Sequence, residues 1–131
     1  MLAELWLSVL FEFYGKALNI WQHLPGPAGF ETAGAYFNMG TVHEARGDVN
    51  SAVQFNDKEL KILKNIPPPS TPQAADLYCS LGSYFGKQLD FGKALDCIQQ
   101  ARRIRLNFFQ EDHHAITTLN TAVVALEKAI E

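Results

Sequence analysis

The sequence predicts an all-α fold built from repeated antiparallel helix pairs, and two spacings lead to this prediction. Similar segments end at Ile20, Ile62 and Ile104, so both intervals equal 42. A Tyr-x-x-Met/Leu-Gly segment begins at Tyr36 and begins again at Tyr78, which is the same interval. Because two independent segments share one period, we expect the chain to contain copies of a single supersecondary unit.

Length and composition predict one globular domain, and the net charge argues against a nucleic-acid partner. The chain has 131 residues, 47% of them hydrophobic and 19% charged, which provides for one core and not two. A net charge of −3 argues against nucleic-acid binding, which usually needs a strongly basic surface. Cys79 and Cys97 lack the spacing of a redox or zinc motif, so we expect reduced thiols in a cytoplasmic protein. Spacing alone leaves a disulfide open.

The first element is an apolar helix. Residues 1–13 lack a basic start, contain Glu4 and Glu12, and are shorter than the ~20 apolar residues of a membrane span. We therefore expect a buried helix of a soluble protein. One stripe of this helix consists of Leu2, Leu5, Trp6, Val9, Leu10 and Phe13, while Leu7 and Phe11 lie outside it. Because a helix that is apolar on more than one face has to be covered on more than one face, the chain is predicted to be a fragment or short isoform of a longer array, or to self-associate through residues 1–14.

The first complete helix pair is predicted over residues 31–65. One face of its first helix carries Tyr36, Met39, Gly40 and His43. Gly47 and Asp48 then form a tight turn, in which the aspartate caps the second helix. The packing face of that second helix consists of Ala52, Phe55 and Leu60.

The second complete pair is predicted over residues 72–109. Thr71 followed by Pro72 is typical of a helix start, and Asp90 follows the turn as Asp48 does. The two packing faces consist of Tyr78, Leu81, Gly82 and Phe85, and of Ala94, Ile98 and Ala101. The apolar pattern is interrupted at 25–27, 67–72 and 110–112, which separates the copies.

Glycines recur at equivalent places inside the predicted helices. A glycine within a helix costs about 1 kcal/mol relative to alanine, so its recurrence indicates a packing requirement. We expect Gly40 to lie against Ala52, and Gly82 against Ala94, which would let the paired helices approach closely.

A half repeat is predicted over residues 113–131, and its register stays open. Thr118, Thr121, Ala122 and Ala125 match the earlier copy at an offset of 40, whereas Leu119, Ala122, Val123 and Leu126 match it at an offset of 41. Adjacent histidines such as His113 and His114 point in different directions on a helix, so we expect a turn and helix start there and no metal site. The sequence contains no phosphate-binding glycine loop, nucleophile elbow or His-Glu-x-x-His motif, so neither a cofactor nor catalysis is expected.

The pattern from Tyr78 to Ala101 resembles the tetratricopeptide repeat (TPR), and the 42-residue period together with Glu111-Asp112-His113-His114 is similar to its kinesin-light-chain-like subclass. The resemblance covers residues 8–131. It implies one domain over residues 1–131, a right-handed α-solenoid in which half repeats at 8–24 and 113–131 flank about two full repeats. His43, Asn56 and Glu59 depart from the family pattern, so we expect the Asn56 and Glu59 end to pack loosely or face solvent.

The resemblance also implies a concave groove, lined by the first helix of each pair, in which a peptide or protein segment binds. In the kinesin-light-chain-like subclass an asparagine before the Met-Gly pair contacts the peptide backbone. Asn38 matches this motif, Asn120 matches it only at the offset of 40, and Ser80 departs from it; the alternative is that the asparagines are solvated surface residues. Lys87 is the one basic candidate, so a carboxylate clamp is not expected. The groove candidates are Phe37, Asn38, Thr41, Glu44, Cys79, Ser80, Ser83, Lys87 and Asn120, with Val123 beside the last.

The expected function is a non-catalytic cytoplasmic scaffold whose partner is another protein or peptide. The alternative is a structural segment of a larger TPR protein whose groove is filled intramolecularly, or which acts through self-association. A third is a regulatory segment attached to an enzyme domain. Arg102, Arg103 and Arg105 are expected on the outer surface, either solvated or in contact with an acidic partner or an anionic membrane surface.

Overall fold

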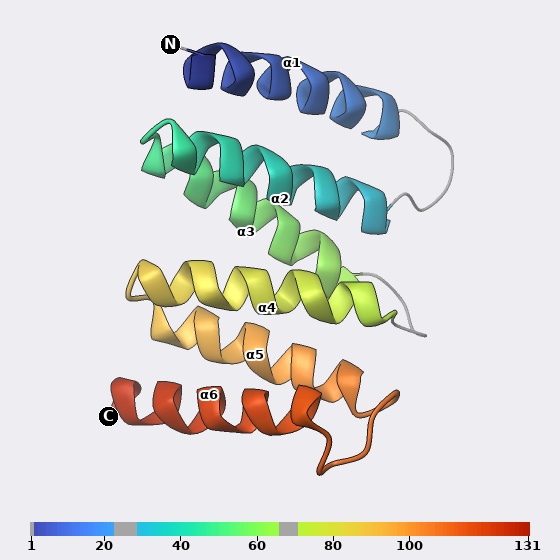
Figure 1. Cartoon of the computed structure of the whole chain (residues 1–131), viewed down its shortest axis with the longest axis vertical. Coiled ribbons are helices and arrows are strands. Elements are labelled where there is room, and N and C mark those ends of the chain that lie inside the picture. The colour runs from blue at the N-terminus through green and yellow to red at the C-terminus, as the bar shows by residue number, and fades with distance from the viewer. Residues whose placement is uncertain (1, 23–28, 66–70) are drawn as a thin grey trace. The chain divides into compact units, whose positions relative to one another are not determined.

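The computed structural model describes residues 2–22, 29–65 and 71–131, and every regular element within these ranges is an α-helix (Figure 1). The helices are α1 (Leu2–Gln22), α2 (Gly29–Ala45), α3 (Val49–Asn65), α4 (Pro72–Lys87), α5 (Phe91–Arg105) and α6 (His114–Ile130). The all-α prediction is thus confirmed for this part of the chain. The predicted breaks at 25–27 and 67–69, and the side chain of Ile20, lie outside the described residues. The chain forms two compact units, residues 1–66 and 67–131.

The first unit contains α1, α2 and α3, with α2 antiparallel to each neighbour along the chain (Figure 1). Its core is a cluster of buried α2 side chains, Ala35, Tyr36 and Met39. Tyr14 from α1 packs against this cluster, as do Phe55 and Ile62 from α3. α1 begins at Leu2, earlier than the predicted half repeat at 8–24.

The second unit contains α4, α5 and α6, and α5 packs against both of the others (Figure 1). α4 starts as predicted, because the Thr71 hydroxyl accepts a hydrogen bond from the Ala74 N–H at 3.3 Å and Pro72 is the first helical residue. His113 caps α6 by accepting the Ala115 N–H at its Nδ1 atom, 3.0 Å away. The predicted helix start at the histidine pair is therefore confirmed.

The turns inside the two helix pairs are equivalent residue by residue. Gly47 has a φ of 79°, and Leu89, which occupies the same position in the second pair, has a φ of 63°. The Asp48 N–H donates to the His43 carbonyl at 2.8 Å, and the corresponding bond of the second pair measures 2.9 Å. Left-handed backbone suits glycine and costs a leucine roughly 1 kcal/mol, so the second copy keeps the turn despite an unfavourable residue.

The aspartates after these turns cap the following helices as predicted. The Asp48 carboxylate accepts the Ser51 N–H at 3.2 Å, and the Asp90 carboxylate accepts the Lys93 N–H at the same distance. These bonds satisfy amide groups that a helix start otherwise leaves without a partner. The hydrogen bond to Ser51 is also the main cause that lowers the pKa of Asp48.

The repeated glycines do mark a close helix approach. Ala94, the predicted partner of Gly82, does come close, since a Cβ atom there would lie 3.5 Å from the Ala94 carbonyl oxygen, but in both pairs the nearest atoms belong to another residue. A Cβ atom on Gly40 would lie 2.8 Å from the Asn56 Oδ1 atom, and one on Gly82 would lie 2.7 Å from the Ile98 Cδ1 atom. Asn56 and Ile98 are themselves equivalent in the two pairs, and each lies one helical turn beyond the alanine that the sequence pattern favoured. In both pairs a Cβ atom at this position would displace the side chain of the paired helix.

The prediction that Asn56 and Glu59 pack loosely or face solvent is wrong. Asn56 is 3% exposed and Glu59 is fully buried. Their equivalents, Ile98 and Ala101, are also buried, so the geometry of the hairpin carries both polar side chains inward. Within the described chain neither Glu59 carboxylate oxygen has a hydrogen-bond partner, and burial raises the pKa of Glu59 to about 9.

Burial along α6 favours the second of the two registers, the offset of 41, for the third copy. Ile116 and Leu119 are buried, and in that register they correspond to Ala75 and Tyr78, which are buried in α4. The offset of 40 would place Thr118 at the position of Tyr78, and Thr118 is exposed. Thr121, rather than Asn120, then corresponds to Asn38.

α1 is not the buried helix that the sequence predicted. The side chain of Leu2 is 84% exposed, and those of Leu5, Trp6 and Phe13 are each 63% exposed. Val9 is also exposed, whereas Leu10 is half-buried. Within the described residues no helix combines the length and the apolar character needed to cross a bilayer.

Candidate interaction surface

Three groove candidates of α2 have an equivalent 42 residues later on α4: Phe37 and Cys79, Asn38 and Ser80, and Thr41 and Ser83, whereas Glu44 and Lys87 are 43 residues apart. Phe37 and Asn38 are half-buried on α2, and Cys79 and Ser80 are half-buried at the equivalent positions of α4. The remaining α2 and α4 candidates are all exposed: Thr41, Glu44, Ser83 and Lys87. Helix packing therefore leaves one face of α2 in the first unit, and one face of α4 in the second unit, in contact with solvent.

The α2 face combines an aromatic ring with a carboxamide. The carboxamide of Asn38 can donate one hydrogen bond and accept another, which suits a peptide backbone. The Thr41 hydroxyl donates to the Phe37 carbonyl at 3.0 Å, so this proton is used within the helix while the oxygen can still accept.

The α4 face carries smaller polar groups. Ser80 and Ser83 present hydroxyls, and burial is the main cause that raises the pKa of the Cys79 thiol. Cys79 and the buried Cys97 of α5 are not joined in a disulfide within the described chain. A raised thiol pKa is unfavourable for nucleophilic chemistry, because the thiolate is the reactive form.

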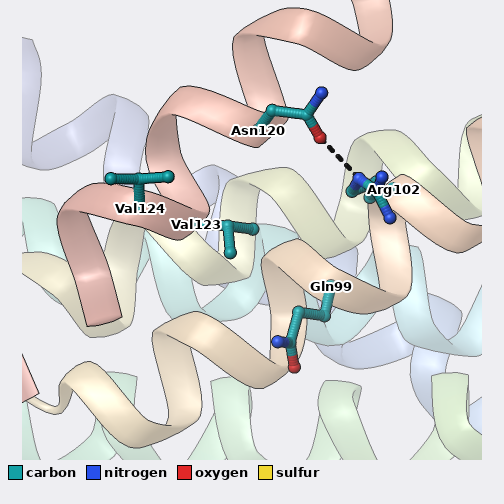
Figure 2. A pocket seen from close by; sticks show the side chains of 5 residues that line it. All are labelled: Gln99, Arg102, Asn120, Val123 and Val124. Carbon is teal, nitrogen blue, oxygen red and sulfur yellow. Dashed lines mark hydrogen bonds between the residues drawn. The ribbon is translucent and has the colours of Figure 1, made fainter. Parts of the chain in front are cut away.

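Asn120 lies against α5. Its Oδ1 atom accepts a hydrogen bond from the Arg102 Nε–H at 2.5 Å (Figure 2). The two residues line a pocket of about 320 Å³ together with Gln99, Val123 and Val124. The Oδ1 atom of Asn120 is therefore engaged with a neighbouring helix, and a contact of Asn120 with a peptide stays a prediction. In the offset of 41 it corresponds to Cys79, another groove candidate.

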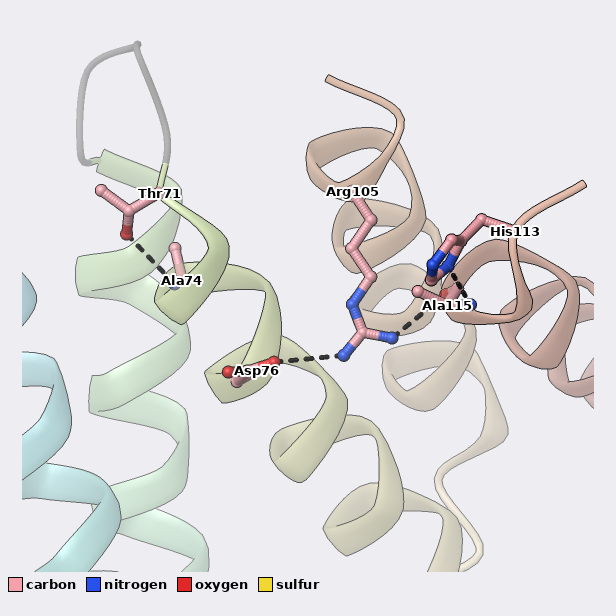
Figure 3. A network of polar contacts seen from close by, with 6 residues as sticks. All are labelled: Thr71, Ala74, Asp76, Arg105, His113 and Ala115. Atoms are coloured by element: carbon pink, nitrogen blue, oxygen red, sulfur yellow. Dashed lines mark hydrogen bonds and ion pairs between the residues drawn. The ribbon is translucent and has the colours of Figure 1, made fainter. Parts of the chain in front are cut away.

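The prediction of an outward-facing, solvated arginine cluster is wrong for two of its three members. Arg105 joins all three helices of its unit, donating to the Asp76 carboxylate at 3.1 Å and to the Ala115 carbonyl at 3.2 Å (Figure 3). Arg102 holds Asn120, and Arg103 is exposed and bonds to Gln100. A guanidinium group has several donors on a long side chain, so it can reach helices that helical spacing does not reveal.

A contact of His43 with two aromatic rings and a carboxylate was missed by the sequence prediction. The His43 ring stacks on Phe55 with centroids 5.1 Å apart and meets Phe11 of α1 edge-on at 5.2 Å. Its Nδ1 atom lies 3.4 Å from the Asp48 carboxylate. His43 therefore fills the place that Phe85 occupies in the second pair. The equivalence of these two residues in the repeat could have predicted that the His43 ring packs among aromatic side chains.

Groups of three or more potential metal ligands are absent from the described ranges. The polar clusters that the structure does contain are helix caps and helix-to-helix contacts, as at His113 and Arg105 (Figure 3).

Comparison with known proteins indicates a distant relationship. No family model matches the chain. Over 112 residues, or 86% of the chain, it is 23% identical to the Clustered mitochondria protein homolog of Homo sapiens. The chain spans 9% of the length of that protein. This relative contains TPRs, so the similarity agrees with helical repeats and suggests a role in protein interaction.

Proposed function

We propose that the chain is a non-catalytic interaction module of the TPR type, a right-handed solenoid that binds an extended peptide or protein segment along α2, α4 and α6. The observation that carries the proposal is the equivalence of the two helix pairs at the positive φ, the aspartate cap and the glycine contact. Repeats that agree at this level are the units from which solenoids are stacked. The likeness to a TPR-containing protein supports the same proposal.

Recognition would centre on the α2 face. Asn38 would hold the peptide backbone, and Phe37, half-buried beside it, would contact an apolar side chain of the ligand. One such hydrogen bond contributes about 0.5–1.5 kcal/mol, so the apolar contact and further polar contacts along α4 must supply most of the affinity.

A selected peptide tests this proposal. A random-peptide display library is selected against the wild-type chain, and the dissociation constant of the best peptide is measured by fluorescence anisotropy. Asn38→Ala should weaken binding about 2- to 12-fold, which corresponds to one hydrogen bond, and Phe37→Ala should weaken it more.

Asn65→Ala is the matched control, because it removes the same carboxamide from an exposed position at the end of α3. It should leave the dissociation constant unchanged. If Asn38→Ala and Phe37→Ala have no larger effect than Asn65→Ala on any selected peptide, the α2 face is not the binding site.

The second candidate function is assembly, in which the chain is a structural segment that acts through self-association. The specific observation that favours it is the exposed apolar stripe of α1. Peptide binding and assembly use different helices, so the protein can perform both.

A further inference from the structure

The α1 stripe, defined as Leu2, Leu5, Trp6, Val9, Leu10 and Phe13, is an apolar surface that the first unit does not use for its own core. The opposite side of α1 serves that purpose: Tyr14 packs on the α2 core, and Phe11 meets His43. The guanidinium of Arg46, in the turn after α2, lies over the Phe11 ring, 5.8 Å from its centroid. The exposure of the stripe is therefore not a consequence of an unpacked helix.

We propose that the α1 stripe binds the α1 stripe of a second copy of this chain, with the two helices antiparallel about a two-fold axis between residues 7 and 8. A two-fold contact needs a surface that is complementary to itself. In this register residue i of one helix lies opposite residue 15 − i of the other. Leu2 then faces Phe13, Leu5 faces Leu10, and Trp6 faces Val9, so every member of the stripe meets another member.

The charged residues near the α1 stripe favour the antiparallel over the parallel pairing of the two helices. A parallel pairing would bring the exposed Glu12 beside Glu12 of the second copy, and like charges at this spacing repel. The antiparallel register separates these carboxylates, because Glu12 lies opposite position 3. Glu4 lies opposite position 11 of the second copy, and Phe11 is on the side of α1 that faces α2, away from the α1 stripe.

The size of the stripe fits a modest dimer. From the exposed fractions of Leu2, Trp6 and Phe13 and those of Leu5 and Val9, each copy would bury on the order of 600 Å². The total of about 1,200 Å² lies at the lower limit of specific interfaces, and its aromatic anchors are of the kind that dominates binding energy. We therefore expect a dissociation constant on the order of 10 µM.

α6 is a poorer occupant for the α1 stripe. α6 also exposes apolar residues, Val124 and Ile130, each 51% exposed. However, Val123 stands where the equivalent helices have Gly40 and Gly82, at which a Cβ atom would come within 3 Å of the paired helix. The Val123 side chain would therefore prevent α6 from approaching α1 of another copy as closely as α2 approaches α3 and α4 approaches α5.

The oligomeric state of the 131-residue chain tests the proposal with a matched pair of variants. Val9→Glu and Val124→Glu place the same charge at two valines that are each 51% exposed on helices. Sedimentation velocity is measured from about 1 to about 200 µM, a range that brackets the expected dissociation constant. Val9→Glu should weaken dimerisation at least about 100-fold, because it buries an unpaired charge, while Val124→Glu should leave it unchanged. Circular dichroism verifies that both variants remain helical.

Disulfide trapping tests the antiparallel register. In a Cys79→Ser background, a mixture of Leu2→Cys chains and Phe13→Cys chains should form cross-linked dimers, because these positions face each other. Phe13→Cys chains alone should not, because their thiols would be about 16 Å apart along the helix axis, beyond disulfide reach.

Each contrary result overturns the proposal. A wild-type chain that is monomeric at the highest concentration would remove the dimer itself. If Val124→Glu lost dimerisation, whether or not Val9→Glu also lost it, α6 would be part of the contact. Efficient cross-linking of Phe13→Cys chains alone would show that the two α1 helices pair in parallel. The dimer does not depend on the proposed peptide site, since Asn38→Ala should still dimerise and Val9→Glu should still bind the selected peptide.

Discussion

The buried carboxyl group of Glu59 makes the stability of this protein depend on pH in a predictable direction. Glu59 is fully buried, and in the described chain its oxygens lack hydrogen-bond partners. Glu59→Gln keeps the volume of the side chain and removes its ionisation. Glu59→Ala recreates the residue found at the equivalent position, Ala101, which is also fully buried.

The size of the effect follows from the pKa. Burial raises the pKa of Glu59 from 4.5 to about 9, so between these values the folded state binds a proton that the unfolded state releases. The stability associated with the protonated carboxyl group is complete below pH 4.5 and is lost as pH rises towards 9. The unfolding equilibrium constant should increase about tenfold per pH unit in this window, which amounts to about 3 kcal/mol at pH 7.

Urea denaturation followed by circular dichroism between pH 5 and pH 8 measures this dependence. The difference in unfolding free energy between the wild type and Glu59→Gln cancels the titration of every other group. It should shift in favour of the variant by about 3–4 kcal/mol over the three pH units. Glu44→Gln, which makes the same substitution at an exposed carboxyl group, is the control. Parallel curves for the wild type and Glu59→Gln would refute the argument.

Three further stability changes follow from the contacts and are measurable by the same denaturation. Leu89→Gly should stabilise the protein by about 0.5–1 kcal/mol because it relieves a positive φ, whereas Gly47→Leu should destabilise it. Changes of the same sign in the two variants would contradict the equivalence of the turns. Gly82→Ala should cost about 1 kcal/mol through contact with Ile98, less in an Ile98→Val background, and purely additive changes would exclude that contact. Arg105→Ala should cost about 1–2 kcal/mol and Asp76→Ala under about 0.5 kcal/mol, since the Asp76 side chain is 70% exposed; equal costs would show that the ion pair dominates over the bond to the Ala115 carbonyl.

Much of the fold could be predicted because its determinants are local and occur twice. The caps at Asp48 and Asp90 and the buried Tyr36 and Tyr78 follow from spacing within one helix pair. The repeat period then verifies each feature against its copy. The helix start at Thr71 is equally local.

The missed features depend on contacts between helices. Glu59 appears solvent-facing from its polarity, but its position in the helix pair, shared with Ala101, carries it inward. The roles of Arg102 and Arg105 depend on how far their side chains reach, which spacing along one helix does not encode. The groove remains a prediction, because exposed positions such as Asn38 follow from a helix pattern whereas a peptide site requires a partner.

The two helix pairs keep the same turn and cap although the residues buried between their helices differ. The first pair carries Asn56 and Glu59 where the second has Ile98 and Ala101, yet both keep the same turn and cap. A costly polar residue in one pair leaves the bonds that define the other untouched. The first pair therefore carries a proton-dependent penalty that the second pair does not share.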